Sequence, residues 1–75
     1  MRRDKIEIFA DILKVAKNGA KKTHIVYKAN LNFSTLKNHI KRLKEKGLLI
    51  QTDGGYYLTT QKGDKFLEQY MKLLG

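Results

Sequence analysis

Between Lys22 and Gly63, two helical patterns, a glycine and a hairpin pattern follow one another without interruption. The first helical pattern ends near Ala29 and the second begins near Phe33, so the link between them is only a few residues long. A link this short forces the second helix to cross the first at a steep angle. Gly47 then ends the second helix, because glycine readily adopts the left-handed conformation found at helix C-termini.

A hairpin pattern follows this glycine. Residues 48–52 and 56–59 are rich in apolar, aromatic and β-branched side chains, which predicts two short strands. Between them lies Asp53-Gly54-Gly55, whose residues tolerate the positive φ angles of tight turns. The sequence therefore predicts a two-stranded hairpin directly after the second of the paired helices.

Helices before and after this segment complete the predicted fold. Asp4 can cap a first helix, Thr23 is the expected N-cap of the short second helix, and Thr60 or Thr59 can cap the last one. We expect helices over residues 4–17, 23–29, 33–46 and 60–74, and a wing over residues 48–59. This order predicts a mostly α protein with a small β-hairpin (α+β), folded as a single winged helix-turn-helix domain over residues 1–75.

Positive charge is concentrated on the two middle helices. The 75 residues carry a net charge of +9, and residues 20–47 hold eight basic residues against one acidic residue, a net of +7. Residues 48–75 balance three basic residues against three acidic ones. This concentration favours a polyanionic partner such as nucleic acid, while a well-solvated pair of lysine-rich helices is the alternative.

The expected third helix has one apolar side and one polar side. Leu36, Ile40 and Leu43 form its inward stripe, and Phe33 lies near that stripe and is expected to pack with it. At about 100° per residue, the opposite side carries the residues expected to contact DNA. Lys and Arg bind phosphates and guanine edges, Asn pairs with adenine, and Ser lets the helix N-terminus approach the backbone. An ordinary solvated helix face remains the alternative for this set, which is Ser34, Lys37, Asn38, Lys41 and Arg42.

Two smaller groups of residues are further candidates for DNA contact. Lys22 and Thr23 lie at the start of a helix, where backbone N–H groups can meet a phosphate. Gly54 and Gly55 at the wing tip would let the backbone approach a sugar-phosphate edge. A plain N-cap is the more frequent explanation of a threonine such as Thr23, and turn geometry is enough to explain the glycines. Asp53 beside the glycines is unfavourable near phosphate.

The sequence lacks the residues that several other classes of function require. The chain has no cysteine, and its two histidines, His24 and His39, are far apart and are each expected to be solvated or adjacent to a helix cap, so no metal site is predicted. No nucleophile with a base, pair of carboxylates or phosphate-binding loop is evident, so we expect neither an enzyme nor a cofactor or small-molecule ligand. No apolar run approaches the ~20 residues of a membrane span, and no signal-peptide pattern is present. A cytoplasmic, nucleoid-associated protein is expected.

The last helix carries more apolar residues than one core-facing stripe requires. A second apolar stripe would be available to another subunit, so the chain could form a homodimer through this helix. The residues expected at that contact are Phe66, Tyr70, Met71 and Leu74.

The sequence resembles the archaeal winged-helix family of predicted transcriptional regulators over residues 11–70. The resemblance rests on the run KTHIVYKANLNFSTLKNHIKRLKEKGLL, followed by YYLTTQKGDKFLEQY. The family includes a small chromatin-associated protein that dimerises through its C-terminal helix. The resemblance implies double-stranded DNA binding through the third helix and wing, often as a homodimer. The last helix here is too short for the long antiparallel coiled coil of some relatives, which leaves a shorter contact.

Two functions compete on these observations. The first is DNA binding, as a transcription regulator or a chromatin-associated protein. The second is a winged helix that serves protein–protein assembly and has no specific DNA target, because one fold supports many functions. RNA is less favoured, because strand alternation sends Tyr56 and Tyr57 to opposite faces of the hairpin and at least one of them is expected to pack.

Overall fold

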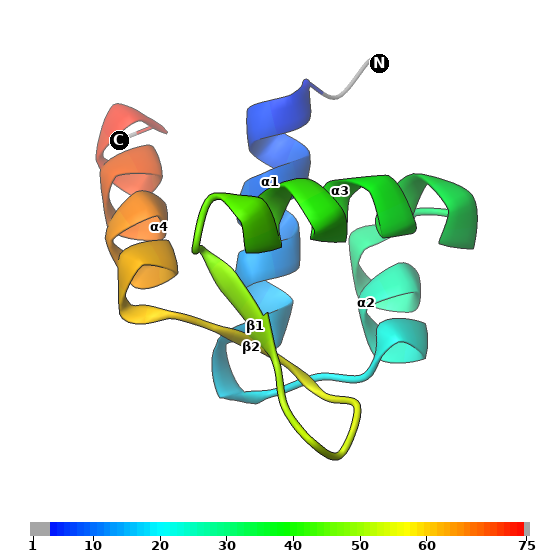
Figure 1. The fold of residues 1–75 in the computed structure, drawn as a ribbon. Coiled ribbons are helices and arrows are strands. Elements are labelled where there is room, and N and C mark those ends of the chain that lie inside the picture. The colour runs from blue at the N-terminus through cyan, green and yellow to red at the C-terminus, as the bar shows by residue number, and fades with distance from the viewer. Residues whose placement is uncertain (1–3, 75) are drawn as a thin grey trace.

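The computed structural model describes residues 4–74, and the side chain of Leu74 lies outside that description. α1 stands between α2 and α4, α3 crosses α1 steeply, and the hairpin lies below these helices (Figure 1). The expected mostly α fold with a small hairpin is confirmed. The elements in order are α1 (Lys5–Val15), a 3-10 turn η1 (Ala16–Asn18), α2 (Lys22–Ala29), α3 (Phe33–Glu45), β1 (Leu49–Gln51), β2 (Tyr57–Thr59) and α4 (Gln61–Leu74).

Side chains fix the starts of three helices. Asp4 caps α1 as predicted, and its carboxylate accepts a hydrogen bond from the Glu7 N–H at 2.9 Å. The hydroxyl of Thr60 caps α4 by accepting from the Gly63 N–H at 3.0 Å. At α3 the cap is Asn32, whose side chain accepts from the backbone of the third helical residue at 2.7 Å. Each cap satisfies an N–H group that the helix itself leaves without a partner.

The predicted cap of α2 is wrong. Thr23 lies inside the first turn of the helix, and Lys21 occupies the N-cap position without a side-chain cap hydrogen bond. The reason is a backbone pairing that the local pattern does not reveal. Ala20 forms an antiparallel bridge with Tyr57, with N–H to O distances of 3.0 and 2.8 Å, and this extended segment fixes where α2 begins.

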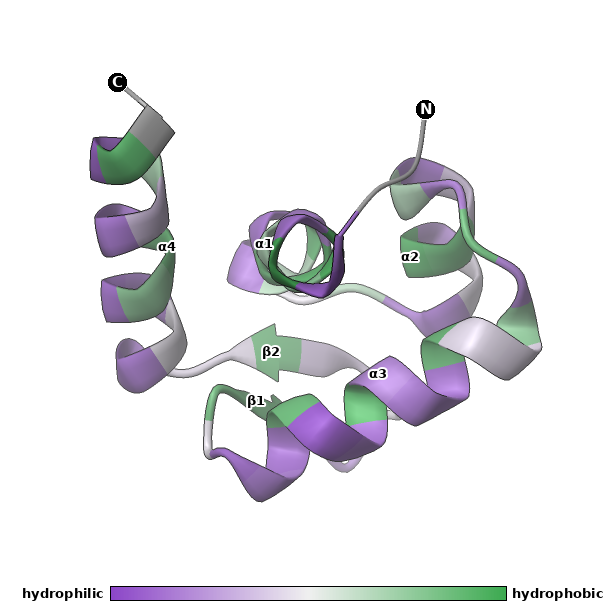
Figure 2. Ribbon diagram, turned by 90° about the horizontal axis from the view of Figure 1, so that it is seen from above, coloured by the Kyte–Doolittle hydropathy of each residue, from purple (hydrophilic) through white to green (hydrophobic). Residues whose placement is uncertain are grey.

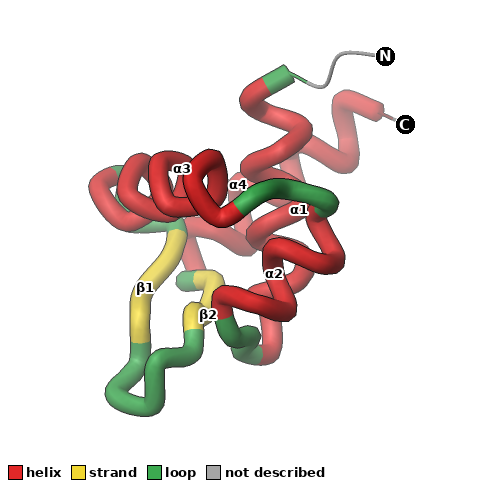
Figure 3. The backbone as a smooth tube through the Cα atoms, turned by 90° about the vertical axis from the view of Figure 1, so that its right-hand side faces the viewer, coloured by secondary structure: helices red, strands yellow, loops and turns green. Residues whose placement is uncertain are grey.

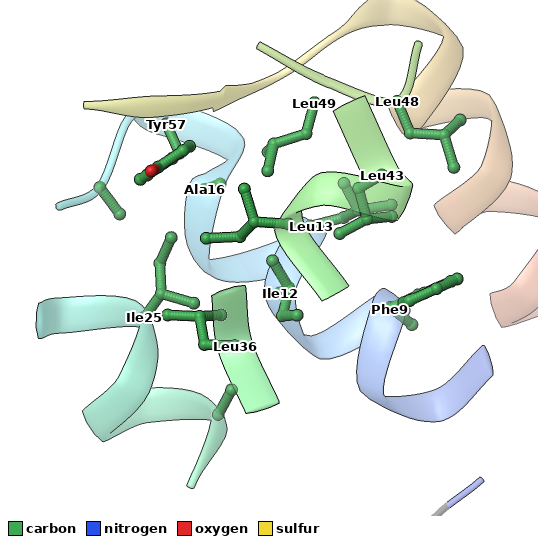
Figure 4. Packing of buried hydrophobic residues seen from close by; sticks show 14 of the residues in the cluster. Phe9, Ile12, Leu13, Ala16, Ile25, Leu36, Leu43, Leu48, Leu49 and Tyr57 are labelled. Carbon is green, nitrogen blue, oxygen red and sulfur yellow. The ribbon is translucent and has the colours of Figure 1, made fainter. Parts of the chain in front are cut away.

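The core lies between α1, α2, α3 and the inner face of the hairpin (Figure 4). Phe9, Ile12 and Leu13 of α1 pack there against the predicted inward stripe of α3. The most deeply buried large side chains are Ile12, Leu13, Ile25, Leu36, Leu43 and Leu49. Burying several large aliphatic groups at one centre is the main favourable term for a chain of this size.

The prediction that Phe33 packs with this core is wrong, since 51% of it is exposed. The link before α3 explains the difference. Asn30 adopts the left-handed conformation at φ 55°, and the Leu31 N–H donates to the Val26 carbonyl at 3.0 Å. This turn directs Leu31 against the core in place of Phe33, which lies at the first position of the helix.

The two strands pair antiparallel, with Ile50 opposite Leu58. Tyr57 faces the core and is 8% exposed, whereas Tyr56 is 44% exposed, so the prediction that at least one of them packs is confirmed. At the turn, the Gly55 N–H donates to the Thr52 carbonyl at 3.0 Å, and Gly55 has φ 82°. That positive φ accounts for a glycine at this position without any ligand.

The junction between the hairpin and α4 is tightly packed. The buried hydroxyl of Thr59 donates to the Leu13 carbonyl of α1 at 2.7 Å. Gly63 is also buried, and a Cβ atom there would collide with the Leu48 carbonyl oxygen and lie 2.6 Å from the Thr59 methyl carbon. Glycine is therefore required at the start of α4 by close approach to its neighbours, since helix formation alone would favour alanine.

Candidate nucleic-acid interface

α3 presents the predicted contact residues to solvent. Because Leu36, Ile40 and Leu43 are buried, the helix has a fixed rotation about its axis, and its hydrophilic side is turned away from α1 (Figure 2). All five predicted residues on that side are exposed, namely Ser34, Lys37, Asn38, Lys41 and Arg42.

A groove between α3, the start of α2 and β2 gathers positive charge. Lys22 reaches it from α2, and Lys37, Lys41 and Lys44 line it from α3. The groove has a volume of about 530 Å³. The same groove is lined by Ile40 and Tyr57, which are buried, and by Glu45, so four lysines and one carboxylate lie around a floor that is apolar. We call this feature the lysine groove, and its four lysines offer an anion several positive charges within one concave surface.

Lys44 is a candidate that the sequence-based set lacked. Its spacing from Lys37 and Lys41, at four and then three residues, puts it on the same flank of the helix. The spacing on the helix could have identified Lys44 from the sequence, but only the fold brings Lys22 and Tyr57 to face this flank and form a groove with it.

The other predicted residues of α3 lie around a second, polar depression. Arg42 lines it together with Asn38, Lys41 and Glu45. Asn38, Lys41 and Glu45 border both hollows, so they occupy the ridge of the helix between them. Ser34 is exposed one turn earlier, toward the N-terminal end of α3.

The start of α2 combines two features that suit an anion. Among the four α-helices within residues 4–74, it alone begins without a side-chain cap hydrogen bond. Thr23 is exposed there, while Lys22 is half-buried beside the lysine groove. Free N–H groups and the positive end of the helix dipole both favour a negative group at such a terminus.

The wing tip is separated from this groove. Gly54 and Gly55 are exposed, and the hairpin extends away from α3 toward its tip (Figures 1 and 3). Closer to its base, the wing gains a positive group that sequence reasoning missed. The Lys21 ammonium lies 5.4 Å from the centre of the Tyr56 ring, a distance suited to a cation–π contact. The pairing of Ala20 with Tyr57 brings these residues together.

Comparison with known proteins agrees with this architecture. A family model described as winged helix-turn-helix matches residues 2–74. The chain belongs to this winged helix-turn-helix family. The predicted resemblance to archaeal winged-helix proteins is confirmed by two archaeal relatives.

The first relative of this winged helix is an uncharacterized protein from Methanocaldococcus jannaschii. The two are 46% identical over 70 residues, which cover 92% of this chain and 33% of that protein. The chain thus spans about a third of the length of the curated relative it matches. The second relative is Sso10a-2, described as a DNA-binding protein from Sulfolobus solfataricus. Its crystal structure matches with a TM-score of 0.80 and 25% identity, over 95% of this chain and 81% of that chain.

His39 of the winged helix is half-buried in the middle of α3, so the prediction that it is solvated or adjacent to a cap is wrong. Its ring packs edge-on against Phe9 of α1, with centroids 5.5 Å apart, and its Nδ1 atom is buried without a hydrogen-bond partner. Burial lowers the pKa of His39, and the positive charges of Lys5 and Arg42 lower it further. The environment between α1 and α3 therefore disfavours the charged form of the ring. His24 is exposed, and no cluster of three or more potential metal ligands is found within residues 4–74.

The residues predicted for dimerisation are divided between two environments. Phe66 and Tyr70 are partly buried against the chain's own core, whereas Met71 is 51% exposed. The prediction for the Leu74 side chain lies outside the described residues. Leu73, which was not in the predicted set, is 87% exposed. Within residues 4–74, none of the helices has both the length and the apolar character needed to cross a membrane.

Proposed function

We propose that this winged helix binds double-stranded DNA, with α3 at the major groove. The observation that carries the proposal is the lysine groove, where Lys22 of α2 joins Lys37, Lys41 and Lys44 of α3 around one concave surface. Phosphate contacts from basic side chains provide most of the affinity of such an interface. The DNA-binding description of the structural neighbour from Sulfolobus solfataricus supports the same function.

The positions of the side chains suggest a division of roles along α3. Asn38 and Lys41 lie on the ridge between the two hollows, where a helix entering the major groove comes nearest to base edges. We assign Lys37, Lys44 and Lys22 to one phosphate strand and Arg42 to the other. Thr23, at the uncapped start of α2, would then meet a phosphate through backbone N–H groups. Gly54 and Gly55 would approach the sugar-phosphate edge from the wing tip and form the weaker part of the interface.

A salt series tests the proposal. About six phosphate contacts give a slope near −5 when the logarithm of the binding constant is plotted against that of the salt concentration. Fluorescence anisotropy of a labelled duplex, measured from low to moderate salt, provides the slope. Absence of binding at low salt would contradict the proposal.

The biological role is either transcription regulation or chromatin association. Selection of bound duplexes from a random pool separates the two. An enriched palindrome would indicate a regulator that binds as a two-fold dimer, since half-site symmetry mirrors protein symmetry. No enrichment would indicate an architectural role based on backbone contacts.

The exposed apolar residues of α4 favour a second function, self-assembly through this helix. Met71 and Leu73 project two large apolar side chains from the last turns of α4. Light scattering of the wild type should show a dimer that Met71→Glu converts to a monomer, because a buried unpaired charge opposes association. Gln69→Glu, which adds the same charge at an exposed polar position of α4, is the matched control and should leave the dimer intact. A wild-type monomer at high protein concentration would contradict this function.

A further inference from the structure

Phe33 is an aromatic residue for which the core has no place. Leu31 packs against the core from the link before α3, and 51% of Phe33 is exposed. Single exposed apolar residues are common on protein surfaces, so exposure alone assigns no role. The position of Phe33 at the start of α3 is what suggests a role in binding.

The start of α3 holds Phe33 in a defined place. It is the first residue of the helix, directly after the Asn32 cap, whose hydrogen bond of 2.7 Å fixes the first turn. It precedes Lys37 by four residues, so both lie on the same flank of the helix. The residues next to it on the chain, Asn32 and Ser34, are polar and exposed. The ring is therefore an exposed apolar group with polar neighbours on the chain and Lys37 one turn away, at the end of the helix that contacts base edges in helix-turn-helix proteins.

We propose that Phe33 recognises thymine by packing against its 5-methyl group in the major groove. This inference rests on the DNA binding proposed above. Thymine is the only base that presents a methyl group in the major groove, and Phe is among the side chains suited to that contact. The lysines and Asn38 act through charge and hydrogen bonds at the ends of their side chains, so the aromatic ring of Phe33 adds a preference for a methyl group that those polar groups do not supply.

Replacing thymine by uracil removes the methyl group and leaves the pairing edges unchanged. The probes are two labelled duplexes of identical alternating A·T sequence, one with thymidine and one with deoxyuridine in its place. The wild type should bind the uracil duplex about fourfold more weakly, the value of one buried methyl-sized group. Phe33→Ala should bind the two duplexes equally, and Phe33→Leu should keep part of the preference because leucine retains an apolar side chain.

Lys37→Ala is the matched control, because it alters the same flank of the helix and leaves the Phe33 ring in place. It should weaken binding to both duplexes and keep their ratio. Equal binding of both duplexes by the wild type would overturn the role of Phe33 and leave DNA binding standing. A preference retained in Phe33→Ala would overturn it too, since another contact or DNA stiffness would then be responsible. Failure to bind either duplex at low salt would instead contradict the proposed function itself. Thermal unfolding by circular dichroism establishes that each variant is folded.

Discussion

α3 and α4 are amphipathic helices of 13 and 14 residues that both pack against the core of the domain, yet they present different surfaces to solvent. α3 carries four basic residues against one acidic residue, and its exposed side borders the lysine groove. α4 carries three basic residues against two acidic ones and exposes Met71 and Leu73. Both helices turn an apolar side toward the core, so they differ in the residues that they expose to solvent.

The comparison distinguishes where an amphipathic helix packs from which partner its exposed side can bind. The apolar stripe of each helix determines where it packs, because burial of apolar surface drives folding. The outward side determines which partner it can meet, a polyanion for α3 and an apolar surface for α4. The proposed functions of the two helices can therefore be altered independently of each other.

Charge reversal on α3 is expected to have the largest effect on DNA binding. Lys37→Glu with Lys44→Glu should weaken duplex binding at least ~50-fold at 0.1 M salt, since loss of two phosphate contacts alone changes the binding constant by about this factor. Lys65→Glu with Lys72→Glu changes the net charge equally on α4 and is the matched control. Anisotropy titrations of both variants compare the helices directly. Similar losses in the two would show that net charge, and not the lysine groove, controls binding.

Substitution of glycine tests how closely α4 is held against the hairpin. Gly63→Ala should reduce the free energy of unfolding by about 1–3 kcal/mol, because its Cβ atom would collide with the Leu48 carbonyl and the Thr59 methyl group. Gly54→Ala is the control, since its Cβ atom would meet only the Tyr56 ring at 3.4 Å. Urea unfolding of both variants provides the measurement. A stabilised Gly63→Ala variant, as helix propensity alone would predict, would refute the close packing of α4.

The contact between α3 and α1 should respond weakly to pH through His39. Its pKa is lowered in the folded state by burial and by the charges of Lys5 and Arg42, so the unfolded chain binds more protons below its ordinary pKa of 6.5. Stability from this residue is thus complete above pH 6.5 and is lost as the pH falls through the lower pKa of the folded state.

Urea midpoints at several pH values between 7.5 and 5 measure this loss. His39→Leu should flatten the decrease in that range, whereas His24→Leu, at an exposed position, should leave it unchanged. An identical decrease in the wild type and His39→Leu would assign the pH dependence to other groups.

Much of the fold could be predicted because its signals are local. Asp4 as a cap, the inward stripe of α3 and Gly47 as a helix stop each follow from spacing within a few residues, and Gly47 has the expected positive φ of 76°. The exposure of the contact set on α3 was predictable for the same reason. Once Leu36 and Ile40 are buried, helical geometry leaves the residues opposite them in solvent.

Two of the errors come from contacts between residues far apart in the chain, and the third comes from the turn directly before α3. Thr23 is not the N-cap of α2 because Ala20 pairs with the wing. His39 is partly shielded from solvent because Phe9 of α1 lies against it. Phe33 was expected to pack from its place near the stripe, but Leu31 took that role when the link turned at Asn30. Propensity and periodicity describe one element at a time and do not include these contacts.

The sequence by itself determined the order of the elements, the inward side of each helix and the concentration of positive charge on residues 20–47. These depend on local spacing and composition, which folding does not change. Only the tertiary structure decided that Lys22 joins three lysines of α3 in one groove, that Lys21 lies over Tyr56 and that Phe33 remains outside. Those outcomes depend on how helices and hairpin meet, and close packing in the core allows only one such arrangement.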